Sequence, residues 1–319
     1  MRITAMNNKR SILIIGASGG LANILCGILA KRMPDARIIG IDSRKMKNEV
    51  DFDNYTFHRM RYTRRNFEKL FRENRFESIY QIGRITPPGG SAEERLSFSL
   101  VNTSKVLELA EKYLIKKFIM LSTYHVYGAQ PDNPVFINED YPLKVSIKHP
   151  ELRDVTEIDA LCTNWMWKNR ENIETVVLRP CNIIGPQIDN TISRYLTSNM
   201  TPVPIDFNPM MQFIHEYDMA NILFQALDKI PTGVYNVAPS ETISLQEAKK
   251  ITGTRDIPFP VFTLEVLSKA IRKIWPFPSY FIDFVMYSCI IDNTKIHQYI
   301  PEDIYQYNCR KTLSLIRKG

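Results

Sequence analysis

The stretch SILIIGASGGLANILCGILAKRM, residues 11–33, decides the fold. It begins with an apolar, β-branched run, which predicts a strand buried on both faces. The run enters a turn that holds Gly16, Ser18, Gly19 and Gly20. From about Leu21 to Met33 the chain continues as an apolar helix, whose first N–H groups are left free and point at one place. Together with the helix dipole, these donors predict a binding site for a pyrophosphate.

An acidic residue at the end of the next strand strengthens this interpretation. Residues 36–41 form a second, mostly apolar strand, and Asp42 stands at its end. A carboxylate about 20 residues beyond the glycine turn is placed to accept hydrogen bonds from an adenosine ribose. We expect NAD rather than NADP because a carboxylate repels a 2′-phosphate, although the nearby Arg44 keeps NADP as an alternative. The alternative is a βαβ unit in which the glycines serve only a tight turn and no ligand binds.

Composition places the chain among ordinary globular proteins. Its 319 residues are 44% hydrophobic and 24% charged, which is enough for one large domain or two joined ones. The net charge of +7 comes from dispersed lysines and arginines without a long basic block. Anionic small ligands account for this charge as well as nucleic acid does, so we expect no nucleic-acid partner.

The cysteines and the N-terminus indicate a cytoplasmic protein. The five cysteines are scattered and form no C-x-x-C pair, which favours reduced thiols over disulfides or a metal site. The first ten residues lack the apolar core of a signal peptide. No apolar run reaches the roughly 18 residues of a membrane-spanning helix.

Strands and helices alternate along the chain up to Pro180. Further strands are expected at residues 55–60, 77–82, 117–122 and 175–178, and helices at 66–73 and 92–113. This alternation predicts an α/β protein with a Rossmann-type, doubly wound parallel sheet. Ligands of such sheets bind at the carboxyl ends of the strands. Residues expected at these ends are Gly16, Asp42, Ile82, Ser122 and Arg179.

The alternation fails after Pro180, which predicts a second, smaller part. We expect a dinucleotide-binding domain over residues 1–180, to which residues 212–238 return. The segments 181–211 and 239–319 are expected to form a substrate-binding lid over the strand ends. Predicted elements in this half are helices at 192–199, 218–227 and 244–252, the last opened by a Ser244–Glu247 capping box, and a strand at 233–238.

A set of motifs follows Asp42 in a fixed order along nearly the whole chain. With GASGGLA at 16–22, they are Asn102, LSTYHVYG at 121–128, LRPCNIIGP at 178–186, QFIHEYDMA at 212–220 and GVYNVA at 233–238. In this order and spacing the chain resembles the extended short-chain dehydrogenase/reductases, the NAD-dependent epimerase/dehydratase family.

The resemblance implies bound NAD(P), hydride transfer and, very often, a nucleotide sugar under the lid. The residues expected at the cofactor are Gly16, Ser18, Gly19, Gly20, Leu21, Asp42, Ser43, Arg44, Ile82, Gly83, Asn102, Ser122 and Cys181. Asn182 matches a position that commonly contacts the substrate, and Arg84 is expected to hold a substrate phosphate. A homodimer would suit the family.

The family's catalytic pair is missing. In the family a Tyr-x-x-x-Lys pair acts as acid and base, with a nearby Ser or Thr, because oxidising a carbinol also requires its hydroxyl proton to leave. Thr123 matches the Ser/Thr position. The tyrosine is expected about 25 residues before Arg179, but residues 149–168 contain none, and Glu157 and Asp159 stand near the expected lysine.

Two functions therefore remain open. In the first, an epimerase, dehydratase or reductase uses His125 or Tyr124 with Thr123 to move the proton, since the pKa of histidine suits this task. In the second, the chain is a catalytically inactive cofactor-binding protein, and His125 is a structural or surface histidine. Arg179 is either a phosphate ligand or part of a structural ion pair.

The stretch 263–291 joins an amphipathic helix to several aromatic residues. We interpret it as a lid that packs on the sheet. The alternative is a lipid or membrane surface, because Lys269, Arg272 and Lys273 lie just before Trp275.

Overall fold

The computed structural model describes residues 10–46, 50–85, 91–260 and 277–316, and its centre is a parallel sheet of seven strands. The strand order is β11-β6-β5-β4-β1-β2-β3. The strands are β1 (Ser11–Ile15), β2 (Arg37–Asp42), β3 (Tyr55–Arg59), β4 (Ser78–Gln81), β5 (Lys117–Leu121), β6 (Glu174–Pro180) and β11 (Gly233–Val237). This arrangement confirms the predicted Rossmann-type, doubly wound α/β fold.

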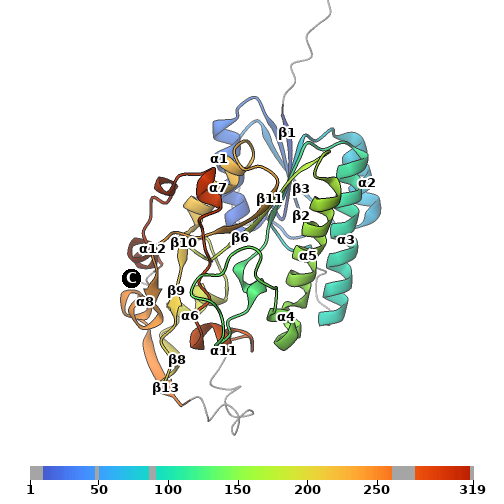
Figure 1. The fold of residues 1–319 in the computed structure, drawn as a ribbon. Helices are drawn as coiled ribbons and strands as arrows, with labels where there is room; N and C mark the ends of the chain where they lie inside the picture. Colours follow the sequence, from blue (N-terminus) through green and yellow to red (C-terminus); the bar gives the residue numbers. More distant parts are fainter. Residues whose placement is uncertain (1–9, 47–49, 86–90, 261–276, 317–319) are drawn as a thin grey trace, which may run out of the picture.

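Helices cover both faces of the sheet (Figure 1). On one face lie α1 (Gly20–Arg32) and α7 (Glu216–Ala226), and on the other α2 (Arg64–Glu73), α3 (Ala92–Lys112) and α5 (Arg153–Asn169). Alternate residues of β1 enter two different cores because successive side chains of a strand point to opposite faces. Ile12 and Ile14 pack with the residues of α1 and α7, and Leu13 and Ile15 with those of α2, α3 and α5.

Capping residues set several helix boundaries. Helix α7 begins at Glu216, slightly before the predicted start at Asp218, because the side chain of His215 accepts a hydrogen bond from the N–H of Tyr217. Helix α3 begins after Ser91, which forms a capping box with Glu94. Ser244 caps α8 (Leu245–Thr252) by accepting the N–H of Glu247, at the predicted place.

A smaller layer lies beyond the carboxyl ends of the strands, at the left and lower left of Figure 1. It contains β7 (Asn182–Ile184), α6 (Thr191–Thr197), β8 (Met200–Pro204), β9 (Met210–Met211), β10 (Phe213–His215), β12 (Ile243–Ser244), α8, β13 (Arg255–Phe259), α11 (Phe281–Met286) and α12 (Cys309–Leu315). The helix expected at 192–199 ends at Thr197, since Met200 already begins β8, which pairs with β13. The division into a cofactor domain and a lid stays a prediction.

Short helices connect β5 to α5. They are η1 (Tyr124–Tyr127), α4 (Val145–Lys148) and η2 (Pro150–Leu152). Near the C-terminus η3 (Ile296–Gln298) and η4 (Glu302–Ile304) precede α12. The connection from η1 to α5 matters for function because it passes over the carboxyl end of the sheet (Figure 1).

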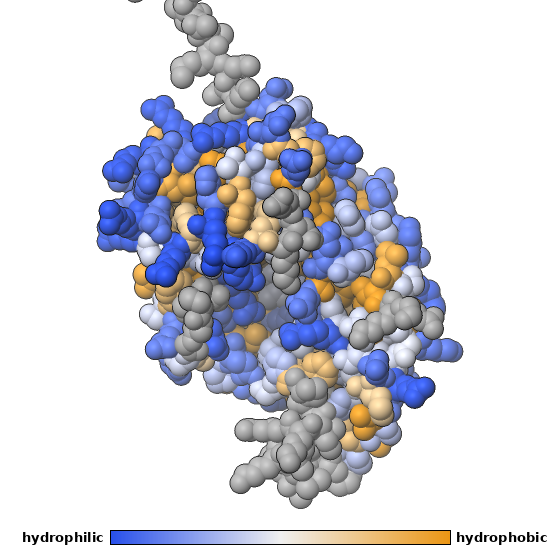
Figure 2. All heavy atoms as spheres, turned by 180° about the vertical axis from the view of Figure 1, so that it is seen from behind, coloured by the Kyte–Doolittle hydropathy of each residue, from blue (hydrophilic) through white to orange (hydrophobic). Residues whose placement is uncertain are grey.

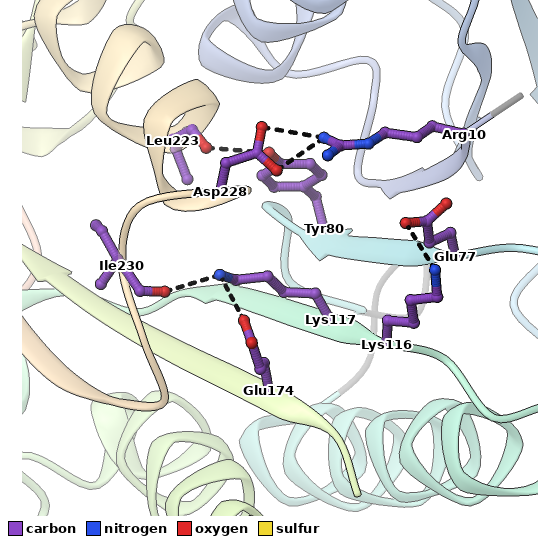
Figure 3. A network of polar contacts seen from close by, with 9 residues as sticks. All are labelled: Arg10, Glu77, Tyr80, Lys116, Lys117, Glu174, Leu223, Asp228 and Ile230. Carbon is purple, nitrogen blue, oxygen red and sulfur yellow. Dashed lines mark hydrogen bonds and ion pairs between the residues drawn. The ribbon is translucent and has the colours of Figure 1, made fainter.

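A network of polar contacts fastens the opposite end of the sheet (Figure 3). The buried Lys117 Nζ donates to the carbonyl of Ile230 at 2.8 Å and pairs with Glu174 at 2.9 Å. The hydroxyl of Tyr80 donates to the carbonyl of Leu223 at 3.0 Å. These contacts join β4 to α7, and the starts of β5 and β6 to the segment that leads into β11.

The face shown in Figure 2 is mainly hydrophilic, with several separate hydrophobic patches. None of the helices that the structure describes is both long and apolar enough to cross a membrane. The basic and aromatic cluster around Trp275, which suggested a lipid surface, lies outside the described residues.

Candidate cofactor and substrate site

The glycine turn after β1 has the backbone that its sequence predicts. Gly16 has a φ of +89°, which favours glycine, and a Cβ there would collide with the backbone of Gly83. Gly83 in turn lies against the Cα of Gly16, so the ends of β1 and β4 touch through two glycines. The predicted turn and Gly83, which is expected at the cofactor, are thus parts of one close contact.

Gly20 has a packing role in addition to the one predicted. A Cβ at Gly20 would collide with the carbonyl oxygen of Gln187, in the loop after β7. Glycine at this position therefore lets a distant loop approach the start of α1. The motif does not reveal this, because the loop belongs to the half of the chain that follows Pro180.

The start of α1 suits an anionic group. Gly19 is the N-cap and provides no side-chain hydrogen bond, and the first turn of the helix contains no acidic residue. The N–H groups of this turn therefore lack intrahelical acceptors and lie at the positive end of the helix dipole. The side chain of Leu21 is buried in the core, which leaves its N–H as the group that can face a pyrophosphate.

Asp42 is held as a carboxylate at the end of β2. Its oxygens accept hydrogen bonds from the Ser18 hydroxyl at 2.6 Å and from the backbone and guanidinium of Arg44. Burial alone would raise the pKa of Asp42, but the hydrogen bonds from Arg44 and Ser18 lower it below its usual value. The adjacent Ser43 uses its carbonyl to accept from Arg59. A ribose that reaches Asp42 must therefore replace the exposed Arg44 side chain.

A cavity of about 330 Å³ opens at the carboxyl ends of β4, β5 and β6. Residues singled out from the sequence form much of its lining, namely Ile82, Gly83, Arg84, Ser122, Thr123, His125, Cys181 and Asn182. Gln81 also lines it, and its buried Oε1 has no hydrogen-bond partner among the described residues. An acceptor of this kind at a strand end, next to the glycine turn, fits a polar ligand such as a dinucleotide.

Thr123 and His125 form one polar pair in this cavity. The Thr123 Oγ1 and His125 Nδ1 lie 2.7 Å apart. Burial and the positive charge of Arg84 lower the pKa of His125 to about 3, which keeps the imidazole neutral around neutral pH. The ring packs against Phe284 and Tyr124, so its orientation is fixed.

The other proton donor considered from the sequence, Tyr124, lies outside the lining of the cavity. Its buried hydroxyl donates to Oδ1 of Asn182 at 2.9 Å, and Nδ2 of Asn182 donates to the carbonyl of Gln212 at 3.0 Å. Burial raises the pKa of Tyr124 well above its usual value. This chain of hydrogen bonds fixes the amide of Asn182 at the cavity wall.

Ser122, Asp159 and Arg179 form a buried brace between β5, α5 and β6. Asp159 accepts the Ser122 hydroxyl at 2.5 Å and Nη2 of Arg179 at 2.6 Å. Arg179 also donates to the hydroxyl of Tyr127 and to the carbonyl of Glu139. Of the two roles considered for Arg179, the geometry shows the ion pair, and Asp159 is its partner.

The face of α5 that borders the cavity is apolar. Val155 and Ile158 line the cavity there, together with Leu152 at the end of η2, just before the helix. Neither a tyrosine nor a lysine of residues 150–169 lines it, as the sequence indicates. Asp154 instead forms an ion pair of 3.5 Å with Arg84, whose guanidinium is half exposed. Asn102 lies outside the lining, and its Nδ2 donates to the carbonyl of Phe98 in the same helix.

Besides Gln81, further polar residues of the cavity are missing from the sequence-based set. They are Asn190, Thr191, Arg194 and Tyr280. The first three belong to the start of α6, whose helical pattern is visible in the sequence although its position over the cavity is not. Tyr280 comes from a segment near the C-terminal end of the chain, far from Thr123 in sequence, and no motif marks it.

Comparison with known proteins agrees with this geometry. The sequence model of the NAD dependent epimerase/dehydratase family matches residues 12–238, well over half of the chain. The chain belongs to that family. An uncharacterized protein of Mycobacterium tuberculosis is 23% identical over 266 residues, which are 82% of this chain and 70% of that one.

Solved structures of epimerases and dehydratases share the fold. A UDP-glucose 4-epimerase of Thermotoga maritima with UDP-glucose superposes with a TM-score of 0.72 at 18% identity, over 96% of this chain and 97% of that one. A dTDP-glucose 4,6-dehydratase of Bacillus anthracis in complex with NAD gives 0.71 at 16% identity, over 96% and 95%. NAD, the cofactor expected from Asp42, is thus the cofactor of the family, and the residues around the glycine turn fit it.

Proposed function

We propose that this epimerase/dehydratase family member binds NAD at the glycine turn and acts on a nucleotide sugar, or a related hydroxylated or keto compound, in the adjacent cavity. The reaction is an epimerisation, dehydration or reduction that does not use a Tyr-x-x-x-Lys pair. The observation that carries this proposal is the Thr123–His125 pair, which faces the cavity where the family's catalytic residues are expected.

NAD, held at the glycine turn and by Asp42, would supply the acceptor or donor for the hydrogen and two electrons of a carbinol carbon. The chain must then move the proton of the hydroxyl group. A neutral imidazole can accept it at Nε2, while Thr123 holds the other ring nitrogen. A pKa near 3 means that His125 needs no deprotonation before it acts, but it also makes the imidazole a weaker base than the ordinary pKa of histidine led us to expect.

Arginines at the cavity suit the phosphates of a nucleotide sugar. Arg84 and Arg194 both line it, and each has an exposed guanidinium that is only loosely paired with a carboxylate, at 3.5 Å. Burial is the main cause of the low pKa of His125 and the charge of Arg84 the smaller one, so a phosphate bound at Arg84 would offset only the smaller cause and strengthen the base to that extent.

The test compares the wild-type protein with His125→Gln. Each is incubated with NAD and UDP-glucose, UDP-N-acetylglucosamine or dTDP-glucose, and the products are separated and identified by mass spectrometry. We expect conversion of at least one nucleotide sugar by the wild type and a loss of about 100-fold in His125→Gln, the usual range for one acid–base residue. His58→Asn, on the exposed β3 strand, is the control.

Calorimetry with the same compounds distinguishes the second function. A wild-type protein that binds NAD but neither binds nor converts any of these sugars would contradict the proposal. That result would indicate the catalytically inactive cofactor-binding protein, for which the apolar face of α5 is the supporting observation. The homodimer and the cytoplasmic location remain parts of the proposal that rest on the family and on the reduced cysteines.

A further inference from the structure

The structure assigns to Tyr280 the role of the substrate-contacting phenol, supplied by the segment before α11 instead of by α5. This inference rests on the proposed function and deepens it. Among the described residues that line the cavity, Tyr280 carries the only phenol and His125 the only imidazole. The two rings lie edge to face with centroids 5.8 Å apart. They therefore border the same small volume.

The position of the hydroxyl supports this role. Tyr280 is half buried, and its hydroxyl lies 3.3 Å from Oγ1 of Thr191, which also lines the cavity. Either oxygen can donate in that contact, so the phenolic proton of Tyr280 stays available for a hydrogen bond to a ligand. A ligand oxygen that enters between Tyr280 and His125 can accept this proton in a hydrogen bond.

The residues around the start of α5 hold Tyr280 in place. Glu151, in η2, accepts the backbone N–H of Tyr280 at 3.1 Å and also the hydroxyl of Ser279. One turn further along, Asp283 accepts His149 Nε2 at 2.7 Å and Lys148 Nζ at 2.9 Å. The helix start that lacks a tyrosine is thus joined by polar contacts to the segment that provides one.

These contacts make Glu151 a positioning residue for Tyr280. It reaches the backbone and a neighbouring side chain and does not line the cavity. Its effect on a ligand must therefore pass through the placement of the phenol. A glutamine keeps an acceptor oxygen at this position, whereas an alanine removes it.

The proton and electrons balance without a change in the charge of Tyr280. When a carbinol is oxidised, NAD would accept the carbon-bound hydrogen with two electrons, and the hydroxyl proton passes to Nε2 of His125. Tyr280 donates a hydrogen bond to the same substrate oxygen before and after the reaction and stabilises the negative charge that develops on it. In the reverse direction the imidazolium returns the proton.

The test measures the binding of UDP-glucose and of UDP by calorimetry in the presence of NAD, because a phenol at the reacting carbon contacts the sugar but not the nucleotide. We expect Tyr280→Phe to bind UDP-glucose about 5- to 10-fold more weakly than the wild type, the range of one lost hydrogen bond, and UDP equally well. Tyr217→Phe, an exposed tyrosine of α7, is the matched control and should bind both as the wild type does.

Glu151 provides a second arm. Glu151→Ala should weaken UDP-glucose binding as Tyr280→Phe does, and Glu151→Gln should restore most of it. In turnover, Tyr280→Phe should lower kcat by about 10- to 100-fold and leave the optimum pH unchanged, since His125 and not the phenol takes up the substrate proton in this mechanism.

Two results would overturn the inference. Equal affinity of Tyr280→Phe and wild type for UDP-glucose would show that the phenol does not touch the sugar, and would leave the proposed function standing. No binding of UDP-glucose, UDP-N-acetylglucosamine or dTDP-glucose by the wild type would overturn both, and the two failures are thereby distinguished.

Discussion

His215 and Asp218 stand one helical turn apart at the start of α7 and respond to pH in opposite ways. Burial lowers the pKa of His215 to about 4, and its ring lies stacked on Tyr307 at 4.0 Å. Burial raises the pKa of Asp218 to about 6, although two backbone N–H groups near Tyr307 donate to its carboxylate. Both residues contact the segment around Tyr307 that leads into α12. Protonation of either residue therefore changes the contacts between α7 and this segment.

The signs follow from the two pKa values. The unfolded chain protonates histidine near pH 6.5, so the contribution of His215 to stability falls as the pH drops from about 6.5 to 4. Asp218 is protonated more readily in the folded state, so its contribution falls as the pH rises from about 4 to 6. In the wild type the two effects partly cancel.

His215→Asn should remove this cancellation while it keeps a capping side chain. We expect its free energy of unfolding to decrease by about 1 kcal/mol more than that of the wild type as the pH rises from 4 to 6. Urea unfolding at several pH values measures this. Parallel pH curves for the two proteins would contradict it, and His58→Asn on the exposed strand β3 serves as the control.

Arg44 competes with the cofactor for Asp42, and this predicts its effect on cofactor choice. Its guanidinium lies 3.3 Å from the carboxylate and is largely exposed. Arg44→Gln should bind NADP about tenfold more weakly, because the phosphate loses its nearby cation, and should bind NAD at least as well as the wild type. Calorimetry with both dinucleotides measures the ratio, with Lys31→Gln at the end of α1 as control. Unchanged NADP affinity would exclude this role.

At the scale of elements, α11 is held by charged side chains as well as by apolar packing. The buried carboxylate of Asp283 joins it to Lys148 and His149 beside α5. Hydrogen bonds to Asp283 outweigh the effect of burial and lower its pKa below the usual value. The position of the segment that carries Tyr280 therefore depends on the ionised carboxylate of Asp283 in addition to its apolar contacts with the core.

Asp283→Ala should loosen this segment. It leaves His149 buried without its partner, and we expect a loss of about 2–4 kcal/mol in the free energy of opening of α11. Hydrogen exchange should become faster for residues 279–287 and stay unchanged for α1. Asp206→Ala, an exposed aspartate, should have no effect. Equal exchange in Asp283→Ala and wild type would show that apolar packing alone holds the helix.

The sequence predicts those parts of the site whose residue type is dictated by the backbone. Gly16 needs a positive φ and Asp42 ends a buried strand, so both are recognisable from local pattern. The apolar cavity face of α5 is not recognisable, because Val155 and Ile158 follow the same helical period as core residues. The position of Tyr280 at the cavity could not be predicted, because its segment is held by residues that are distant in sequence. Glu151 binds the backbone of Tyr280, and His149 binds Asp283.

At the scale of the molecule, we expect the buried ammonium group of Lys117, at the start of β5, to contribute to the free energy of unfolding. Lys117 satisfies the carbonyl of Ile230 from inside the sheet, whereas the ion pair of Arg10 with Asp228 beside it is exposed (Figure 3). Exposed pairs contribute little, and buried groups that lose a partner cost more.

Lys117→Met should therefore lower the free energy of unfolding by about 1–3 kcal/mol, because the carbonyl of Ile230 loses its donor. Arg10→Gln, in the same network, should change it by less than about 1 kcal/mol. Urea unfolding of the two variants measures the contrast. Similar values for both would show that burial of Lys117 brings no advantage over the exposed pair.

The brace of Ser122, Asp159 and Arg179 has a consequence for protein engineering. It fastens α5 to two strands through Asp159, which lies one turn beyond Val155 and does not itself line the cavity. The residue by which α5 itself is held, Asp159, is thus different from the residues that this helix shows to a ligand. Leu152 and Val155 can be exchanged for other side chains without removing any member of the brace. These two positions are therefore suitable for introducing polar or catalytic side chains into the cavity.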